Sequence, residues 1–382
     1  MEPIYLDHAA TTPVHAYVWE AMLPFYTVHY GNPSSTHSFG RASRTALNRF
    51  RDGMAKALGC LPGELIFTSG GTESNNMAIF GIMHGAQDGK KHIVTTAIEH
   101  HAVLHPCERL ERLGFEVTYL PVDATGVIQI EDVEAAIRPD TALISMMYVN
   151  NEVGTIQPIE QVGQLARKHG IPFHVDAVQA LGKLPLNLAE LPVDLVSLSA
   201  HKIYGPKGAG ALYVSKHTKL LPHVFGGSQE RKRRAGTENV PAIAGFAKAI
   251  ETILPRQEEI SSQAREMREH MISIIEQQLG CDAFIINGNK ELQVPHILNI
   301  SFPGISTETL LMNLDLEQVA AASGSACTSG SLEVSHVLKA MNLPENVTNS
   351  AVRFSFGMGN SKEQIETAAQ KVATIVKRLR NK

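Results

Sequence analysis

Short apolar runs and helical patterns alternate along the first half of the chain. Between about residues 60 and 215, each apolar run ends in a polar or glycine-rich turn. We predict strands within residues 64–69, 91–100, 116–122, 141–149, 171–178, 193–200 and 208–215, and helices through 75–83, 103–114 and 159–170. Strands that alternate with helices are typical of a mostly parallel sheet covered on both faces.

The pattern changes after Pro241. Residues 241–280 are helical and amphipathic, and Pro255 is expected to kink or break that helix. Near the end of the chain, Ser361 and Gln364 form a capping box for a last helix. Two strands and the buried face of this helix are expected at 296–304, at 351–357, and at Ile365, Ala368, Ala369, Val372, Ile375, Val376 and Leu379. The sequence therefore predicts an α/β protein with a large domain and a smaller C-terminal α+β domain.

The composition is that of an ordinary globular protein, with 382 residues, 43% of them hydrophobic and 19% charged. The net charge of −4 indicates no direct nucleic-acid or membrane binding. Neither a signal peptide nor an apolar run long enough to span a bilayer is evident. The four cysteines, at 60, 107, 281 and 327, form no C-x-x-C pair, so we expect a reduced, cytoplasmic protein without a structural zinc site.

A glycine-rich turn follows the first predicted strand. Gly70, Gly71 and Thr72 come directly after it, and a helix starts behind them. In open parallel sheets, ligands bind beyond the carboxyl ends of the strands, and a helix N-terminus offers amide hydrogens to an anion. The same turn is equally typical of a plain helix cap. No Walker spacing occurs, so a nucleoside triphosphate is not expected.

Histidines follow the second predicted strand. His100 and His101 come directly after Glu99, and His105 stands four residues beyond His101, a spacing that metal ligands also use. However, the sequence contains no H-E-x-x-H motif and no supporting cluster of cysteines or carboxylates. We therefore predict no metal site, and interpret these imidazoles as hydrogen-bonding or stacking groups.

Carboxylate and amide side chains follow the next two strands. Asn150, Asn151 and Glu152 come after one strand, and Asp176 and Gln179 after another. A carboxylate at the tip of an apolar strand is costly to bury unless a cation lies opposite. That cation could be part of the protein or a protonated ring nitrogen of a ligand.

A lysine follows the last parallel strand. His201 and Lys202 precede the glycine-rich segment YGPKGAG. Taken alone, Lys202 is typical of an exposed loop. Together with the strand-tip Asp176, the anion-type turn and a histidine at the same sheet edge, it indicates pyridoxal phosphate. In such a site a lysine amine binds the cofactor covalently, a carboxylate pairs with the pyridine nitrogen, and a helix N-terminus holds the phosphate.

Motifs along nearly the whole chain resemble those of the cysteine desulfurases, in order and spacing. These are pyridoxal-phosphate enzymes of the class-V aminotransferase fold, also called fold type I. The segments are YLDHAATTP, GNPSSTHSFGR, FTSGGTESNN, EHHAV, VNNEVGTIQPI, HVDAVQ, SAHKIYGPKGAGALY, RRAGTEN, SGSACTSGSLEVSHVL and RFSFG. The resemblance implies a homodimer whose chain divides into an N-terminal segment 1–15 that joins the small domain, a large cofactor-binding domain 16–255 and a small domain 256–382.

The resemblance also implies roles for the residues around the cofactor ring. Lys202 would bind the cofactor and later move the substrate's protons. Asp176 would keep the pyridine nitrogen charged, and His100 would stack on the ring, although a second histidine follows it. Gln179 would bond the ring hydroxyl oxygen.

Further roles concern the phosphate and the substrate. The resemblance assigns the phosphate to Gly71, Thr72, Ser199 and His201, with Thr237 reaching it from the partner subunit. It assigns the carboxylate of the substrate to Asn151, which also lies beside the cofactor, and to Arg353. An arginine fork suits a carboxylate better than a lysine does.

Cys327 lies in SGSACTSGS, a run of small residues without apolar bulk. The resemblance implies that Cys327 is the nucleophile, which takes sulfur from L-cysteine as a persulfide and leaves L-alanine. A thiolate must attack, and no cation is adjacent in sequence, so the activating group must come from elsewhere, with His100 as a candidate. Glycine and serine give the segment reach.

The short cysteine segment resembles the group that supplies iron–sulfur scaffolds and tRNA-thiolation enzymes, so a sulfur-acceptor protein is an expected partner. Two alternatives remain at this point: another lyase of the same fold, such as a selenocysteine lyase or a kynureninase-like hydrolase, and a non-catalytic adaptor. The sequence also departs from the resemblance at FGGSQERKRR, where Ser228 breaks a glycine run. We interpret the basic cluster Arg231–Arg234 as a solvated loop.

Overall fold

The computed structural model describes residues 2–86, 89–324 and 334–381. Its centre is a seven-stranded sheet with the strand order β2-β8-β7-β6-β5-β3-β4. Its strands are β2 (Leu65–Thr68), β3 (His92–Thr96), β4 (Glu116–Leu120), β5 (Thr141–Met147), β6 (Phe173–Asp176), β7 (Leu195–Ser199) and β8 (Gly210–Val214). Strand β8 runs opposite to the other six strands, which share one direction. The predicted mostly parallel sheet is therefore confirmed.

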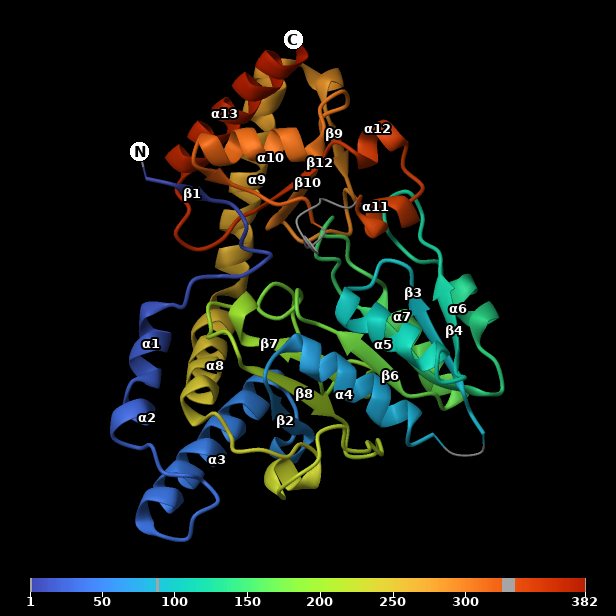
Figure 1. Ribbon diagram of the computed structural model, residues 1–382, viewed down its shortest axis with the longest axis vertical. Helices are drawn as coiled ribbons and strands as arrows, with labels where there is room; N and C mark the ends of the chain where they lie inside the picture. Colours follow the sequence, from blue (N-terminus) through green and yellow to red (C-terminus); the bar gives the residue numbers. More distant parts are fainter. Residues whose placement is uncertain (1, 87–88, 325–333, 382) are drawn as a thin grey trace.

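Helices cover both faces of this sheet because its strands are apolar on both sides (Figure 1). In β2, Leu65 and Phe67 belong to one core, whereas Ile66 belongs to a second core on the opposite face. The helices of this part are α1 (Ala16–Met22), α2 (Pro24–Thr27), α3 (Ser38–Leu58), α4 (Gly71–Met83), α5 (His101–Glu111), α6 (Ile130–Ala136), α7 (Ile159–His169) and α8 (Val240–Ile253). The sequence patterns indicated α4, α5 and α7 but not α3, whose 21 residues are mostly polar.

The predicted break at Pro255 is confirmed. A short turn, η4 (Leu254–Arg256), separates α8 from α9 (Gln257–Leu279). The remaining 3-10 turns are η1 (Pro62–Glu64), η2 (Ala200–Lys202), η3 (Gln229–Lys232) and η5 (Cys281–Ala283). The chain leaves the large sheet at this break and enters the smaller part of the molecule, above it in Figure 1.

The smaller part has its own sheet and its own apolar core. Its antiparallel sheet has the order β12-β10-β9, and α9 and α13 pack side by side along it (Figure 1). The elements are β9 (Ile285–Asn287), β10 (Ile297–Ser301), α10 (Thr307–Leu316), β11 (Val319–Ala320), α11 (His336–Ala340), α12 (Glu345–Thr348), β12 (Ala351–Ser355) and α13 (Lys362–Arg380). The predicted capping box at Ser361 and Gln364 is present, and the face that follows it is buried except for the half-buried Leu379.

The N-terminal segment crosses between the two parts. Strand β1 (Ile4–Tyr5) pairs in parallel with β11, and Ile4 and Leu6 lie in the smaller part's core.

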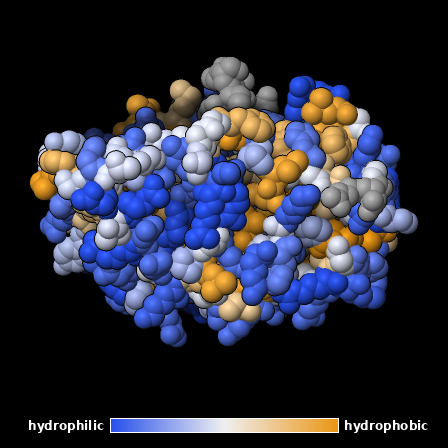
Figure 2. Space-filling view, turned by 90° about the horizontal axis from the view of Figure 1, so that it is seen from below, coloured by the Kyte–Doolittle hydropathy of each residue, from blue (hydrophilic) through white to orange (hydrophobic). Residues whose placement is uncertain are grey.

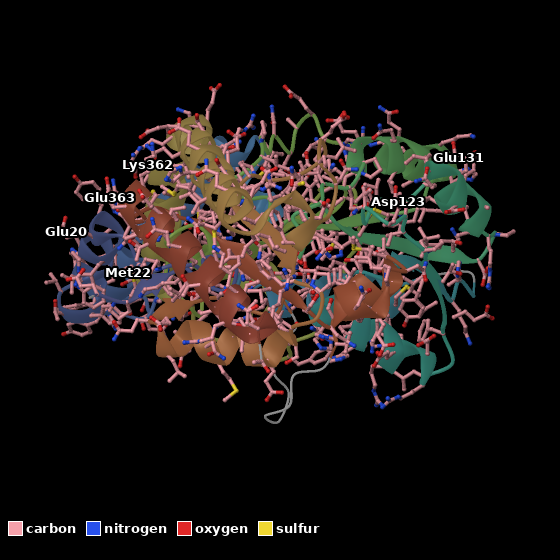
Figure 3. All side chains as sticks on the ribbon, turned by 90° about the horizontal axis from the view of Figure 1, so that it is seen from above. Glu20, Met22, Asp123, Glu131, Lys362 and Glu363 are labelled. Carbon is pink, nitrogen blue, oxygen red and sulfur yellow. The ribbon has the colours of Figure 1, made fainter. Side chains whose placement is uncertain are left out.

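Seen from above, Glu20 and Met22 of α1 lie on one side of the molecule and Asp123 and Glu131 on the other (Figure 3). We propose that the predicted segments 1–15, 16–255 and 256–382 divide the chain into its domains.

The basic cluster is only partly a solvated loop, which corrects that interpretation. Arg231 and Lys232 are exposed, but Arg233 donates a hydrogen bond to the carbonyl of Gly63 (2.5 Å). Arg234 forms an ion pair with Glu73 at the start of α4 (2.7 Å). Arg233 and Arg234 therefore tie the loop to η1 and to the start of α4. Among the described residues, no helix is long and apolar enough to cross a membrane.

Candidate active site

A cavity of about 450 Å³ opens at the carboxyl ends of β3, β5, β6 and β7, where the smaller part and the N-terminal segment meet the sheet. Ten of the residues predicted for the site line it: Gly71, Thr72, His100, Asn151, Asp176, Gln179, Ser199, His201, Lys202 and Arg353. The other lining residues are Asp7, Ala9, Ala10, Asn75, Met147, Val149, Val178, Ala322 and Gly324, which sequence reasoning did not single out.

Lys202 reaches this cavity because the turn η2 follows β7 directly. Its Nζ donates hydrogen bonds to the carbonyl oxygens of Ala9 (2.5 Å) and Ala10 (2.8 Å). Burial lowers the pKa of the Lys202 amine to about 8, and the charge of Arg353 contributes in the same direction. A lysine with this pKa keeps a substantial neutral fraction near physiological pH, which is what a nucleophilic amine needs.

Asp176 is the last residue of β6, and two donors fix its carboxylate. Asn75 donates from Nδ2 to Oδ2 of Asp176 at 2.6 Å, and the amide of Val178 donates to Oδ1 at 3.0 Å. Asn75 is 1% exposed and lies one turn of α4 beyond Thr72. The only sequence signal for it was this spacing from the glycine turn, because residues three apart share a helix face.

The glycine turn forms the N-terminus of α4 at the cavity. Gly70 is the N-cap residue with a φ of 151°, and no side-chain hydrogen bond caps the helix. A Cβ on Gly71 would come within 2.6 Å of Val178 Cγ2, which explains the glycine there. Nearby, Ser199 Oγ is buried and has no hydrogen-bond partner among the described residues. Free amides and an unpaired hydroxyl together suit an anion.

His100 precedes α5 and lines the cavity, whereas His101 faces away from it. The Nδ1 of His100 accepts the amide hydrogen of Ala102 at 3.0 Å, which orients the ring. Loss of solvent lowers the pKa of His100, although the charge of Asp176 opposes this change. His101 instead contacts the rings of His105 and His336, each with a centroid distance of 4.8 Å. No group suited to a metal ion occurs among the described residues.

Arg353 reaches the cavity from β12, on the smaller part. Its Nη1 donates to the carbonyl oxygen of Asn151 at 2.8 Å, and its Nη2 donates to Oδ1 of Asp7 at 2.7 Å. The guanidinium is nearly inaccessible to solvent, and its Nε is buried without a partner among the described residues. The contact of Asn151 with Arg353 therefore uses its backbone, and Asp7 is an ion-pair partner that the sequence did not reveal.

The N-terminal segment holds two further predicted residues in place. Gln179 donates from Nε2 to the carbonyl of Ala9 at 2.8 Å. A ring nitrogen of His201 lies 3.2 Å from Oγ1 of Thr11. Sequence reasoning gave this segment no part in the site, because its residues stand far from the others in the chain.

Two predicted residues are not found in this cavity. Thr237 is exposed and lies beside a separate, smaller cavity lined by Ser69, Arg234 and Glu238. Within one chain, Thr237 therefore contributes nothing to the site. Cys327 lies outside the described residues, although Gly324, which precedes it, lines the cavity.

Comparison with known proteins agrees with this geometry. A family model for class-V aminotransferases matches residues 4–367. The chain is 51% identical over 380 residues to a putative cysteine desulfurase IscS 1 of Bacillus subtilis, covering 99% of this chain and all of that protein. It is 48% identical to the cysteine desulfurase IscS of Dictyoglomus turgidum, over 99% of this chain and 95% of that one.

Solved structures show the same likeness. A NifS-like protein superposes with a TM-score of 0.92 at 37% identity, over 98% of this chain and all of its own. SspA, solved in complex with cysteine, superposes with a TM-score of 0.83 at 37% identity, over 93% of this chain and 99% of its own. By its sequence, its fold and the residues that meet at the sheet edge, the chain belongs to the class-V aminotransferase family and, within it, to the cysteine desulfurases.

Proposed function

We propose that this protein is a pyridoxal-phosphate-dependent cysteine desulfurase, which converts L-cysteine to L-alanine and holds the sulfur as a persulfide on Cys327. The observation that carries the proposal is the convergence of Lys202, Asp176 and Arg353 on one cavity. An amine with a lowered pKa, a strand-tip carboxylate and a buried guanidinium are the groups that an amino-acid reaction on pyridoxal phosphate requires.

The residues present fit pyridoxal phosphate. The amides at the start of α4 and the unpaired Ser199 hydroxyl suit its phosphate, with Thr72 and His201 beside them. Asp176 suits its pyridine nitrogen, because the carboxylate is already held in place by Asn75. When bound, pyridoxal phosphate supplies an electron sink for the charge that develops at the substrate's Cα.

The protein's own groups would move the protons. Lys202, with a pKa lowered to about 8, suits a base that removes a proton from Cα of the substrate and returns one later. His100 lies at the same cavity with its pKa lowered by loss of solvent, so its neutral ring suits accepting the proton of a thiol. A thiol must lose its proton before it can attack, and His100 would accept that proton.

Arg353 and Asn151 would bind the substrate through its carboxylate. The buried Nε of Arg353 and the remaining Nη hydrogens are the donors available for it. Lys202, which the amino group of the substrate must approach, lines the same cavity as these donors.

Cys327 would then attack the sulfur of the substrate. The S–S bond of a persulfide forms as the C–S bond of cysteine breaks, and Cβ takes a proton to become the methyl group of alanine. The balance is L-cysteine plus a protein thiol giving L-alanine plus a protein persulfide, with no external oxidant. Support for Cys327 comes from the sequence and from Gly324 at the cavity wall.

The test combines activity with spectroscopy. The protein loaded with pyridoxal phosphate should show an absorbance band of a lysine-bound cofactor, absent in Lys202→Ala, and should form equal amounts of L-alanine and protein-bound sulfur. Cys327→Ala should keep the band and lose persulfide formation, whereas Cys281→Ala, an exposed control cysteine, should keep both. Full sulfur release by Cys327→Ala would favour another lyase, and the absence of any band would favour an adaptor.

We also propose a homodimer that passes its sulfur to an acceptor protein in the cytoplasm. Exposed aromatic residues support an interface near α1–α3: Tyr17, Trp19, Tyr26, Tyr30 and Phe39. Figure 2 shows apolar patches among charged residues on the face seen from below. Because Thr237 does not reach the cavity of its own chain, it is available to the partner's phosphate site. A fully active monomer by sedimentation would overturn the dimer, and acceptors are to be tested by transfer of labelled persulfide sulfur.

A further inference from the structure

Asp7 is already paired with Arg353, the arginine that the proposed function assigns to the carboxylate of the substrate. Its Oδ1 accepts a hydrogen bond from Nη2 of Arg353 at 2.7 Å, and both side chains line the cavity. Asn151 fills a second position on the guanidinium with its carbonyl oxygen. An incoming carboxylate therefore meets an arginine that already carries a charged partner.

The backbone at Asp7 is fixed, so this contact is built into the fold. Leu6 donates its amide to the carbonyl of Ala320, and Ser355 donates its amide to the carbonyl of Leu6, each at 2.8–2.9 Å. Ala9 donates its amide to the hydroxyl of Ser355 at 2.8 Å. His8 donates its amide to the carbonyl of Ser355 at 3.4 Å, so both neighbours of Asp7 are tied to β11 or β12. The side chain of Asp7 is thereby presented to Arg353, which is itself on β12.

The two members of the pair differ in access to water. The side chain of Asp7 is 22% exposed, whereas that of Arg353 is 5% exposed. Among the described residues, the Asp7 carboxylate bonds to no side chain other than Arg353. Asp7 can therefore leave and be hydrated at modest cost, but Arg353 cannot remain buried without a counter-charge.

From this asymmetry we infer that Asp7 is an internal competitor that neutralises Arg353 in the substrate-free protein and yields to the α-carboxylate of the substrate. The inference rests on the proposed function. Asp7 then lowers the affinity for the substrate by the strength of its own ion pair, and it favours ligands whose carboxylate replaces it. The charge of Asp7 also acts on the Lys202 amine, where it opposes the lowering of the pKa by burial, and on the Tyr5 phenol, whose pKa it raises.

Asp7→Asn tests the inference because it keeps the shape and removes the charge. With the loaded protein, L-alanine is titrated while the cofactor absorbance is followed, and L-alaninamide, which lacks the carboxylate, is titrated in parallel. We expect L-alanine to bind about fivefold more tightly to the variant, the factor that corresponds to an ion pair of about 1 kcal/mol, with L-alaninamide within about twofold of the parent. The KM for L-cysteine should fall with it.

Two controls accompany this measurement. Asp7→Glu keeps the charge and should keep the weaker binding of L-alanine, and Glu2→Gln removes an exposed carboxylate from the same segment and should change nothing. Thermal unfolding of each variant establishes that it is folded. Unchanged or weaker binding of L-alanine by folded Asp7→Asn overturns the inference, as does an equal change for both ligands. Because alanine and persulfide formation by the parent protein test the proposed function separately, the two failures are distinguishable.

Discussion

Asn75 is expected to be needed for tight cofactor binding, although it does not contact the cofactor in the proposed arrangement. Its amide is buried and donates to Asp176 at 2.6 Å. A hydrogen bond to a charged group contributes about 1.5–3 kcal/mol, which corresponds to a factor of roughly 10–150 in an equilibrium constant. If Asp176 binds the pyridine nitrogen, loss of the hydrogen bond from Asn75 weakens the contact between Asp176 and that nitrogen.

The substitution to use is Asn75→Leu, because leucine has a similar size and leaves no room for a water molecule to replace the amide. We expect the dissociation constant of pyridoxal phosphate to rise at least tenfold, measured by equilibrium dialysis and by the absorbance of the bound cofactor. Asn75→Ala should show a smaller loss, because water fits the space that it opens. Asn76→Ala is the matched control, since Asn76 is half-buried and, within the described ranges, its side chain bonds only to the Thr72 carbonyl of its own helix.

A cofactor affinity of folded Asn75→Leu equal to that of the parent would contradict this expectation. The hydrogen bond would then fix only the apoprotein. A spectroscopic readout separates the two roles: the nitrogen-15 resonance of a labelled pyridine ring reports its protonation directly. In Asn75→Leu this resonance should move toward that of the unprotonated ring, a change that a purely structural role would not cause.

Three further predictions concern pH and stability. Burial lowers the pKa of Lys202 to about 8, so the apoprotein should bind the cofactor covalently at a rate that rises with pH and levels off above about 8. The rate is followed by stopped-flow absorbance, and an inflection near 10.5 would contradict the lowered pKa. Glu230→Gln should destabilise the protein by about 3 kcal/mol in thermal unfolding, because it leaves the buried charge of Arg51 unpaired, whereas Glu134→Gln at the surface should have no effect. Lys232→Gly should stabilise it by about 1 kcal/mol, because Lys232 has a φ of 66°; an unchanged melting temperature would count against strain there.

Local patterns were enough to predict most of the large sheet. Its strands are buried on both faces, so they read as uninterrupted apolar runs, and the turns after them carry the polar residues. Since parallel strands end at one edge, the sequence also predicted that Asp176 and Lys202 would lie close together. The sequence patterns did not predict the helix α3, because only one narrow side of it is apolar.

The family, the strands of the large sheet and the identity of the groups at their ends can be inferred from local sequence, because each of these depends on neighbours in the chain, whereas the short strands β1, β9 and β11 were not predicted. The pairing of Asp7 with Arg353, 346 residues away, and the contacts of Lys202 with the carbonyls of Ala9 and Ala10 arise only in the folded chain. No periodicity encodes such contacts. They arise because β1 joins the smaller part's core, and burying Ile4 and Leu6 there carries the next residues across the cavity.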